Sequence, residues 1–207
     1  MLKPWRHHRG FTLVELMVTL AVAALLLVAA VPAFGLWIQN VQIRSTAESL
    51  QNGLRRAQAE AITRGTQTVF VLSTSAPAWN AAPTANASNW SVRAQPVANS
   101  AEATATATDK THPLIEGSTY GSQTNVSISG PALLCFNSGG RLITSTAVAV
   151  PNVGSASCGA SPATYDIKRG DTIDADHKAY RVTVTVGGRV RMCDLGKTLS
   201  SDNPDGC

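Results

Sequence analysis

The chain has 207 residues, of which 14% are charged, and this length allows one medium-sized globular domain beside an N-terminal helix. The formal net charge is +4, but Lys3, Arg6 and Arg9 supply most of it, so the remainder of the chain is close to neutral. Binding of a polyanion through bulk charge is therefore excluded, and such binding would need a local basic patch.

An apolar segment of roughly 24 residues follows Gly10, and Glu15 is the single ionisable side chain within it. About 20 consecutive apolar residues span a bilayer as a helix, whereas the apolar core of a secretory signal peptide has about 7 to 15. A transmembrane helix is therefore predicted over residues 11–35. Since basic residues precede it and no acidic residue does, residues 1–10 are expected in the cytoplasm and the rest is expected to be exported.

The run from Arg9 to Glu15, RGFTLVE, resembles the processing site of type IV prepilins and type II secretion pseudopilins. The resemblance implies that residues up to Gly10 are a leader, which prepilin peptidase removes before it methylates the new amine of Phe11. The family's glutamate and helix-bending proline match Glu15 and Pro32. In a filament, Glu15 would then pair with the N-terminal amine of a neighbouring subunit. This pairing would compensate the carboxylate charge, which is costly in apolar surroundings. An ordinary N-terminal anchor is the alternative interpretation.

The helix is expected to continue as an amphipathic half over residues 36–65. Apolar or small residues recur there at spacings of three, four and seven, which places them on one face of a helix. Such a face needs a partner surface, so this half is expected to pack under a sheet, and Gly65 is expected to end the helix. The face consists of Leu36, Ile43, Ala47, Leu50, Leu54, Ala57 and Ala61.

Short β-rich segments predict a globular domain over residues 66–207. In the first of them, alternation places Val69 and Val71 on one face. Two low-complexity stretches, 74–88 and 98–111, lack the apolar residues to pack and are expected to be exposed loops or partly disordered. The expected strands cover residues 66–73, 89–95, 125–129, 133–136, 141–150, 164–168 and 178–192.

This order, a long helix and then mainly antiparallel strands, resembles the minor-pilin branch called the GspH/FimT family. The resemblance implies an α+β, type IV pilin-like fold. The segment CFNSGGRLI, around Phe136 and Gly140, resembles that branch's mid-domain pattern of an aromatic strand followed by a glycine turn.

All four cysteines lie in the part of the chain that is expected to be exported, where an even number suggests two disulfides. Three connectivities are possible, and proximity in the sequence favours Cys135 with Cys158 and Cys193 with Cys207. The second pair would tie the polar C-terminal residues to the last strand. The alternative is that the four cysteines bind a zinc ion, but no CxxC pair is present.

The segment from Arg181 to Cys193, RVTVTVGGRVRMC, alternates between apolar and polar side chains, which is typical of strands with one buried face. A three-residue loop at 186–188, with Gly188 in the left-handed conformation, would pair Val184 with Val190. That register places three arginines on one polar surface, namely Arg181, Arg189 and Arg191.

Clustered arginines on a strand can simply raise solubility and blunt edge pairing, or they can bind phosphate in a bidentate fashion. The run from Gly188 to Arg191 is a GRxR sequence, and it resembles the motif through which some FimT-type minor pilins hold DNA during natural transformation. The resemblance implies a DNA-binding site of Gly188, Arg189 and Arg191, with Arg181 beside it. Binding of double-stranded DNA would be weak, salt-sensitive and independent of base sequence. Nearby acids oppose it, namely Asp171, Asp174, Asp176 and Asp194.

The acidic segment 171–177, DTIDADH, offers oxygen ligands and one imidazole, and some pseudopilins bind calcium near the C-terminus. Its spacing does not fit an EF-hand loop, so a solvated turn is expected, with no metal or other cofactor. Nucleophile, zinc and phosphate-loop motifs are absent from the sequence. The protein is therefore expected to be the substrate of a processing enzyme and not an enzyme itself. The four histidines, none of which lies in such a motif, are His7, His8, His112 and His177.

Two functions follow from these features. In the first, a minor type IV pilin resides in the bacterial inner membrane with its C-terminal domain in the periplasm, joins other pilin subunits in a pilus and binds extracellular DNA for uptake. In the second, a structural minor pilin or type II secretion pseudopilin primes or caps the filament without binding DNA.

Overall fold

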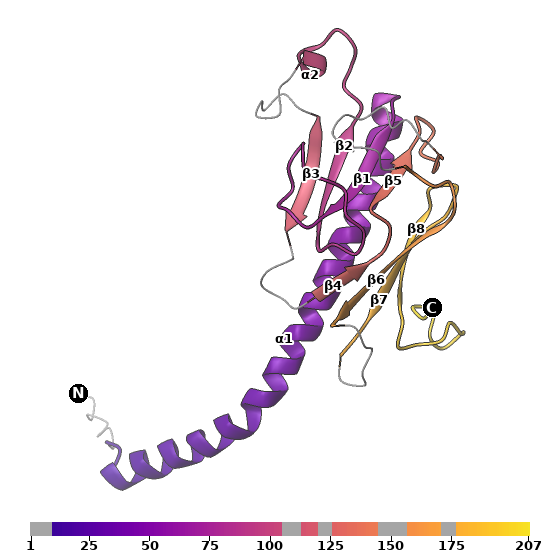
Figure 1. Cartoon of the computed structure of the whole chain (residues 1–207). Coiled ribbons are helices and arrows are strands. Elements are labelled where there is room, and N and C mark those ends of the chain that lie inside the picture. Colours follow the sequence, from indigo (N-terminus) through magenta and orange to yellow (C-terminus); the bar gives the residue numbers. More distant parts are fainter. Residues whose placement is uncertain (1–9, 105–112, 120–125, 145–156, 171–176) are drawn as a thin grey trace, which may run out of the picture. The chain divides into compact units, whose positions relative to one another are not determined.

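The chain forms two compact units, Met1–Ile38 and Gln39–Cys207, and its elements are labelled in Figure 1. The computed structural model describes residues 10–104, 113–119, 126–144, 157–170 and 177–207, without the side chains of 29–33. Helix α1, Leu13–Arg64, begins in the first unit and ends in the second.

The first unit consists of the N-terminal part of α1 and the residues before it. Thr12 caps the helix, because its Oγ1 atom accepts a hydrogen bond from the backbone N–H of Glu15 (3.2 Å). Gly10 and Phe11 are exposed and precede the helix. The helix continues through Pro32, whose side chain lies outside the described residues, as do residues 1–9 of the expected leader.

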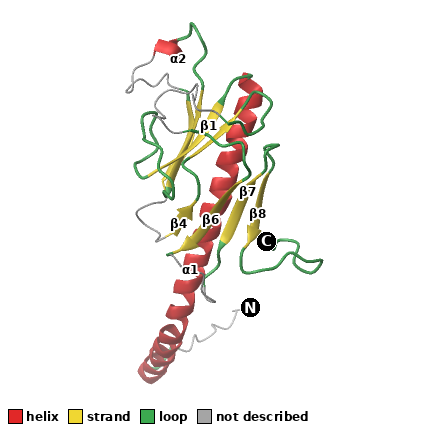
Figure 2. Cartoon of the chain, turned by 45° about the vertical axis from the view of Figure 1, so that its right-hand side comes forward, coloured by secondary structure: helices red, strands yellow, loops and turns green. Residues whose placement is uncertain are grey.

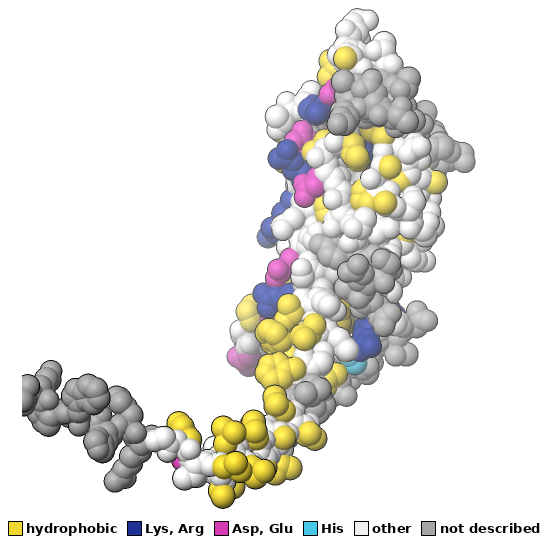
Figure 3. Space-filling view, turned by 90° about the vertical axis from the view of Figure 1, so that its left-hand side faces the viewer, with side chains coloured by type: hydrophobic (Ala, Val, Ile, Leu, Met, Phe, Trp, Pro, Cys, Tyr) yellow, Lys and Arg dark blue, Asp and Glu magenta, His cyan; other side chains and the backbone are white. Residues whose placement is uncertain are grey.

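Apolar side chains cover the visible face of α1 near its N-terminal end (Figure 3). They are exposed from Phe11 to Val28. Among the residues that the structure describes, no helix has a stretch long and apolar enough to cross a membrane.

The second unit combines the C-terminal half of α1 with two antiparallel sheets, which lie along this half of the helix in Figure 2. The order in the first sheet is β3-β2-β1-β5 and in the second β4-β6-β7-β8. The first sheet consists of β1 (Thr68–Ser73), β2 (Asn89–Ala94), β3 (Leu114–Thr119) and β5 (Leu133–Phe136). The second consists of β4 (Val126–Ser129), β6 (Ala163–Arg169), β7 (Tyr180–Val184) and β8 (Val190–Asp194). A short helix, α2, spans Ala101–Thr104.

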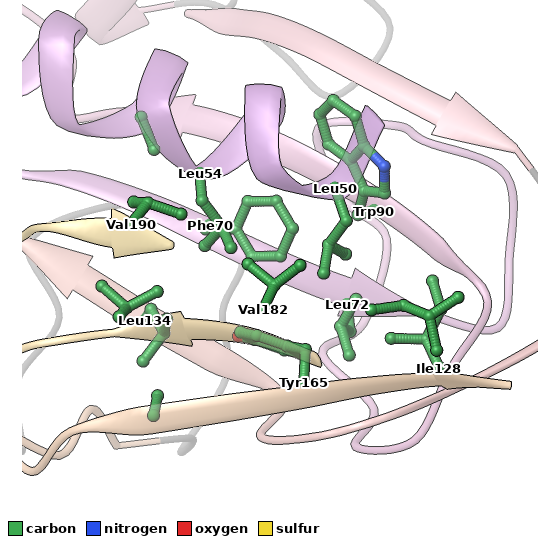
Figure 4. Close-up of a cluster of buried hydrophobic side chains, with 14 of the residues drawn as sticks. Leu50, Leu54, Phe70, Leu72, Trp90, Ile128, Leu134, Tyr165, Val182 and Val190 are labelled. Atoms are coloured by element: carbon green, nitrogen blue, oxygen red, sulfur yellow. The ribbon is translucent and has the colours of Figure 1, made fainter. Parts of the chain in front are cut away.

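The predicted apolar face of the helix forms one side of the main core. Its residues from Ile43 to Ala61 are fully buried, and they belong to one cluster with side chains from both sheets. Figure 4 shows Leu50 and Leu54 of α1 among Phe70 of β1, Tyr165 of β6 and the other labelled side chains. Leu36 is exposed and belongs to the first unit, so the buried face begins at Ile43 and not at Leu36. As predicted, α1 ends before Gly65, whose φ is 63°.

The segment 74–88 is an irregular loop, as predicted, but the prediction that it could not pack was wrong, because Trp79, Ala81 and Ala87 are buried. Trp79 is buried against Val69, Val71 and Cys135, on the face of β1 opposite the helix. Every residue of β1 is therefore buried, because the helix covers one face of this sheet and the loop covers the other.

Fully buried Arg93 holds this loop in place. Its Nη2 atom donates to the carbonyl oxygen of Ala81 (2.6 Å), and its Nε atom donates to Ser91 Oγ (3.3 Å). Burial lowers the pKa of Arg93 to about 10, because desolvation disfavours the charged form.

Three other features differ from the predicted elements. Strand β3 was not predicted; it is an edge strand with half-buried and exposed residues, so it lacks the apolar content of a core strand. Helix α2 lies in the second low-complexity stretch, where Glu102 pairs with Arg64 (3.1 Å). In the predicted strand 141–150, Leu142 forms an isolated bridge with Phe136, and residues 145–150 are outside the described part.

Both disulfides join the cysteines that lie closest in the sequence. Cys135 of β5 is bonded to Cys158, and Cys193 of β8 is bonded to Cys207 near the chain end. Proximity in the sequence therefore selected the correct one of the three possible connectivities.

Candidate nucleic-acid interface

The β7–β8 hairpin has the predicted register. Val184 pairs with Val190, and the backbone N–H of Thr185 donates to the carbonyl oxygen of Arg189 (3.0 Å). The N–H of Gly188 donates to the carbonyl oxygen of Thr185 (2.8 Å), and Gly188 has a φ of 86°. The turn is therefore a three-residue loop that ends in a left-handed glycine.

Alternation along the hairpin separates a buried face from an outer face. Val182, Val184 and Val190 are buried in the core. Arg189 and Arg191 are exposed, while Arg181 is half-buried. Since side chains of a strand point alternately to its two faces, the outer face of this sheet carries the polar residues of the predicted site.

Arg181 is paired within the sheet. Its Nε and Nη2 atoms donate to the two carboxylate oxygens of Asp166 on β6, at 2.6 and 2.8 Å. This pairing raises the pKa of Arg181. Because the carboxylate already compensates its charge, Arg181 has less to offer a DNA phosphate than an unpaired arginine.

Arg189 and Arg191 differ from Arg181 in this respect. In the part of the chain that the structure describes, neither of them forms an ion pair with a carboxylate. The N–H of Arg189 donates to Thr185 Oγ1 (3.2 Å). Arg189, just before β8, and Arg191, on β8, are thus exposed guanidinium groups whose charges no carboxylate of the described residues compensates.

The loop after β5 supports the turn that precedes Arg189. The N–H of Leu142 donates to the carbonyl oxygen of Val186 (2.9 Å), and Gln58 of α1 donates to the carbonyl oxygen of Gly140 (3.1 Å). Arg141, which is exposed, lies in this loop. The sequence indicated the glycine turn but not that the turn brings a further arginine next to the hairpin.

The outer edge of β8 is covered. With its side-chain oxygen facing two donors, Gln51 of α1 accepts hydrogen bonds from the N–H of Met192 (3.2 Å) and from Arg55 Nη2 (3.1 Å). The N–H of Asp194 donates to the carbonyl oxygen of Asp205 (2.7 Å). Strand addition at this edge is therefore blocked, whereas the face that carries Arg189 remains open.

Several charged side chains along α1 form ion pairs within the described residues. Arg44 pairs with Glu48 (2.8 Å) and Arg56 with Glu60 (2.7 Å) along α1; basic and acidic side chains alternate along one border of the domain in Figure 3. The arginines of these pairs are exposed on the helix and make a solvated surface, while Glu48 and Glu60 are half-buried.

In the acidic segment 171–177, Asp171, Asp174 and Asp176 lie outside the described residues. The Nε2 atom of His177 lies 2.8 Å from Arg169 Nη1 and 2.8 Å from Gln39 Oε1. His177 therefore contacts α1 at Gln39. The described residues contain no group of three or more His, Cys, Asp or Glu side chains that could hold a metal ion.

Comparison with known proteins identifies two regions of the chain. The prokaryotic N-terminal methylation motif matches residues 5–31, and the family model of type II transport protein GspH matches residues 46–188, which is more than half of the chain. No curated protein gives a significant match.

Two solved structures are similar at low sequence identity. The type IV minor pilin FimU of Pseudomonas aeruginosa is 15% identical, with a TM-score of 0.43 over 72% of this chain and 90% of that chain. The minor pseudopilin EpsH from the type 2 secretion system of Vibrio cholerae is 15% identical, with a TM-score of 0.45 over 75% of this chain and 99% of that chain.

The family match and the architecture agree. The long N-terminal helix packed on antiparallel sheets is an α+β, type IV pilin-like fold. The family implies other pilin subunits in a filament, and the methylation motif implies a prepilin peptidase as processing enzyme. The chain therefore belongs to the GspH family, the minor pilins and pseudopilins of type IV pili and type II secretion systems.

Proposed function

We propose that this chain is a minor type IV pilin that binds extracellular double-stranded DNA and supports its uptake in natural transformation. One observation carries the proposal: Arg189, at the end of the β7–β8 turn, and Arg191, on β8, are both exposed, and neither has a carboxylate partner in the described residues. The GRxR run at Gly188 resembles the DNA-binding motif of FimT-type minor pilins.

The chemistry of this strand suits a phosphate backbone. Guanidinium groups remain charged and bind phosphate oxygens in a bidentate fashion. The hydroxyl of Thr185 accepts a hydrogen bond from the N–H of Arg189 (3.2 Å) and keeps its own hydrogen as a neutral donor, whereas the hydroxyl of Thr183 donates to the carbonyl oxygen of Arg191 (3.4 Å). Such contacts bind the phosphate charge and do not depend on the base sequence. With two or three contacts per subunit, binding is weak, and several subunits or other pilins supply avidity.

The N-terminal residues serve assembly in this proposal. Prepilin peptidase cleaves after Gly10 and methylates Phe11, and the segment 11–35 anchors the chain in the inner membrane. Glu15 then pairs with the amine of a neighbouring subunit, and Pro32 allows the helix to bend in the filament. The match of the methylation motif to residues 5–31 supports this part. The second unit is periplasmic before assembly and extracellular in a pilus.

A titration of the full-length chain, in detergent, with a duplex DNA at several salt concentrations tests the binding. Arg189→Gln with Arg191→Gln is compared with Arg44→Gln with Arg56→Gln, which removes the same charge from exposed sites on α1. The first pair is expected to lower affinity by about tenfold or more and to reduce the slope of log affinity against log salt by about 1.8, because two phosphate contacts are lost.

The helix pair is expected to bind DNA nearly as the parent does. If Arg189→Gln with Arg191→Gln leaves affinity and salt slope at the parent's values, the assignment of these two arginines as the DNA-binding site is wrong. The chain would then be a structural minor pilin or pseudopilin that primes or caps a filament.

A further inference from the structure

The guanidinium group of Arg191 is held by the C-terminal tail, defined as residues 195–207. Its Nη2 atom donates to the carbonyl oxygens of Pro204 (3.4 Å) and Gly206 (3.1 Å). A guanidinium group has N–H donors on Nε, Nη1 and Nη2. The donors on Nε and Nη1 therefore stay available, while two acceptors restrain the orientation of the group.

The tail is itself fixed beside β8. The N–H of Asp194 donates to the carbonyl oxygen of Asp205 (2.7 Å), and the N–H of Cys207 donates to the carbonyl oxygen of Asp194 (3.2 Å). The disulfide between Cys193 and Cys207 closes the loop, and in Figure 1 the chain end, in yellow, lies near this sheet. The acceptors of Arg191 are thus anchored next to the strand that carries it.

Gly206 fixes the path of the tail at one of these acceptors. It is buried, and a Cβ atom at this position would lie 2.6 Å from the carbonyl carbon of Thr198 and 2.7 Å from the backbone nitrogen of Leu199. Backbone atoms cannot move aside cheaply. A side chain at position 206 would therefore displace the carbonyl oxygen that Arg191 uses.

We propose that the disulfide-anchored tail is a positioning element that orients Arg191 toward a DNA phosphate; this rests on the proposed DNA binding. An arginine on an exposed strand samples many rotamers, and ordering it on binding costs affinity. The carbonyl oxygens of Pro204 and Gly206 order it beforehand. The charges of the tail do not explain an increase in DNA affinity, because Asp202 repels the phosphates and the charge of Lys197 is paired with Asp205 (2.6 Å).

The test measures the affinity of the full-length chain, in detergent, for a fluorescently labelled DNA duplex at several salt concentrations. Cys193→Ser with Cys207→Ser releases the tail without changing its charge. Gly206→Ala displaces the acceptor while the disulfide stays intact. The matched control is Cys135→Ser with Cys158→Ser, which removes the other disulfide and leaves the tail closed.

Both tail variants are expected to bind about three- to tenfold more weakly than the parent, with an unchanged salt slope, because Arg191 still reaches phosphate but must first be ordered. The control variant is expected to keep the parent's affinity. In an Arg191→Gln background the tail variants should cause no further loss, whereas in an Arg189→Gln background their full effect should remain.

Parental affinity in both tail variants would overturn the inference, as would a loss of equal size in the Arg191→Gln background, since the tail would then act on the fold as a whole. Circular dichroism at the assay temperature identifies a variant that has unfolded. If the variant with Cys193→Ser and Cys207→Ser has unfolded, the affinity of Gly206→Ala tests the inference. If Arg191→Gln alone leaves affinity and salt slope unchanged, Arg191 does not contact DNA and the inference about the tail is overturned; if Arg189→Gln with Arg191→Gln also leaves them unchanged, the proposed DNA binding itself has failed.

Discussion

The α-carbon of Gly188 lies against the backbone carbonyl of Gly140, so closely that a Cβ atom at position 188 would overlap the carbonyl oxygen. The same residue has a φ of 86°, a conformation that disfavours any side chain. The hairpin turn that precedes Arg189 is thereby locked onto the loop that follows β5.

Gly188→Ala is expected to destabilise the second unit by about 2–3 kcal/mol, from backbone strain and from the loss of this close approach. Urea unfolding of residues 39–207 measures the change. Gly187→Ala is the matched control, because a Cβ atom there would meet only Thr185 Oγ1, at 3.9 Å. Equal stability of the two variants would show that the contact with Gly140 does not constrain the turn.

Asp166→Asn is expected to strengthen DNA binding, because it releases Arg181 from its bidentate partner and removes a negative charge from the outer face of the sheet. At low salt the affinity should rise by roughly three- to tenfold, and the gain should shrink as salt increases. Glu48→Gln, which removes one negative charge on α1, serves as control in the same titration. An equal gain in both variants would mean that the charge acts from a distance and that this face is not the site.

Arg93→Met is expected to destabilise the second unit by about 1–3 kcal/mol at neutral pH, because it leaves the carbonyl oxygen of Ala81 without its buried donor. Unfolding in urea measures this loss. Arg56→Met, at an exposed site on α1, should have little effect. A variant as stable as the parent would show that the loop 74–88 is held in place without the hydrogen bond from Arg93.

The free energy of unfolding is expected to depend on pH through Arg93. Burial lowers the pKa of folded Arg93 to about 10, from an ordinary value of 12.5. Above pH 10 the folded state loses a proton that the unfolded chain still binds, so the stability contributed by this residue rises as pH increases through that window. The stability difference between the parent and Arg93→Met should therefore widen above pH 10 and stay constant below it.

Glu15→Val is expected to leave cleavage after Gly10 intact and to abolish incorporation into filaments, because the amine of a neighbouring subunit would lose its charge partner in apolar surroundings. Mass spectrometry of the mature chain measures cleavage, and recovery in sheared filaments measures incorporation. Glu15→Asp retains the charge and should retain part of the incorporation. Filaments that contain the valine variant at the normal level would contradict the assigned role of Glu15.

The features that the sequence predicted correctly depend on local periodicity. Helical spacing identified the buried face from Ile43 to Ala61, and two-residue alternation with a glycine turn identified the pairing of Val184 with Val190. Both patterns arise within one segment, where the geometry of the chain decides which side chains share a face.

The features that the sequence did not predict depend on contacts between distant segments. Polar composition suggested that residues 74–88 would be exposed, yet Trp79 anchors them on a sheet whose other face is covered by the helix. Likewise, Asp166 compensates Arg181 only because β6 lies beside β7. The tail reaches Arg191 through backbone carbonyls, which carry no residue-specific signal.

Capture of labelled duplex DNA on the surface of filament-bearing cells tests most directly whether Arg189 and Arg191 give this subunit its function. Cells with Arg189→Gln and Arg191→Gln should assemble filaments at the normal level and capture roughly tenfold less DNA, in line with the lost phosphate contacts. Cells with Arg44→Gln and Arg56→Gln should capture DNA normally. Normal capture by cells that carry the first pair of substitutions in their filaments would contradict the proposed function.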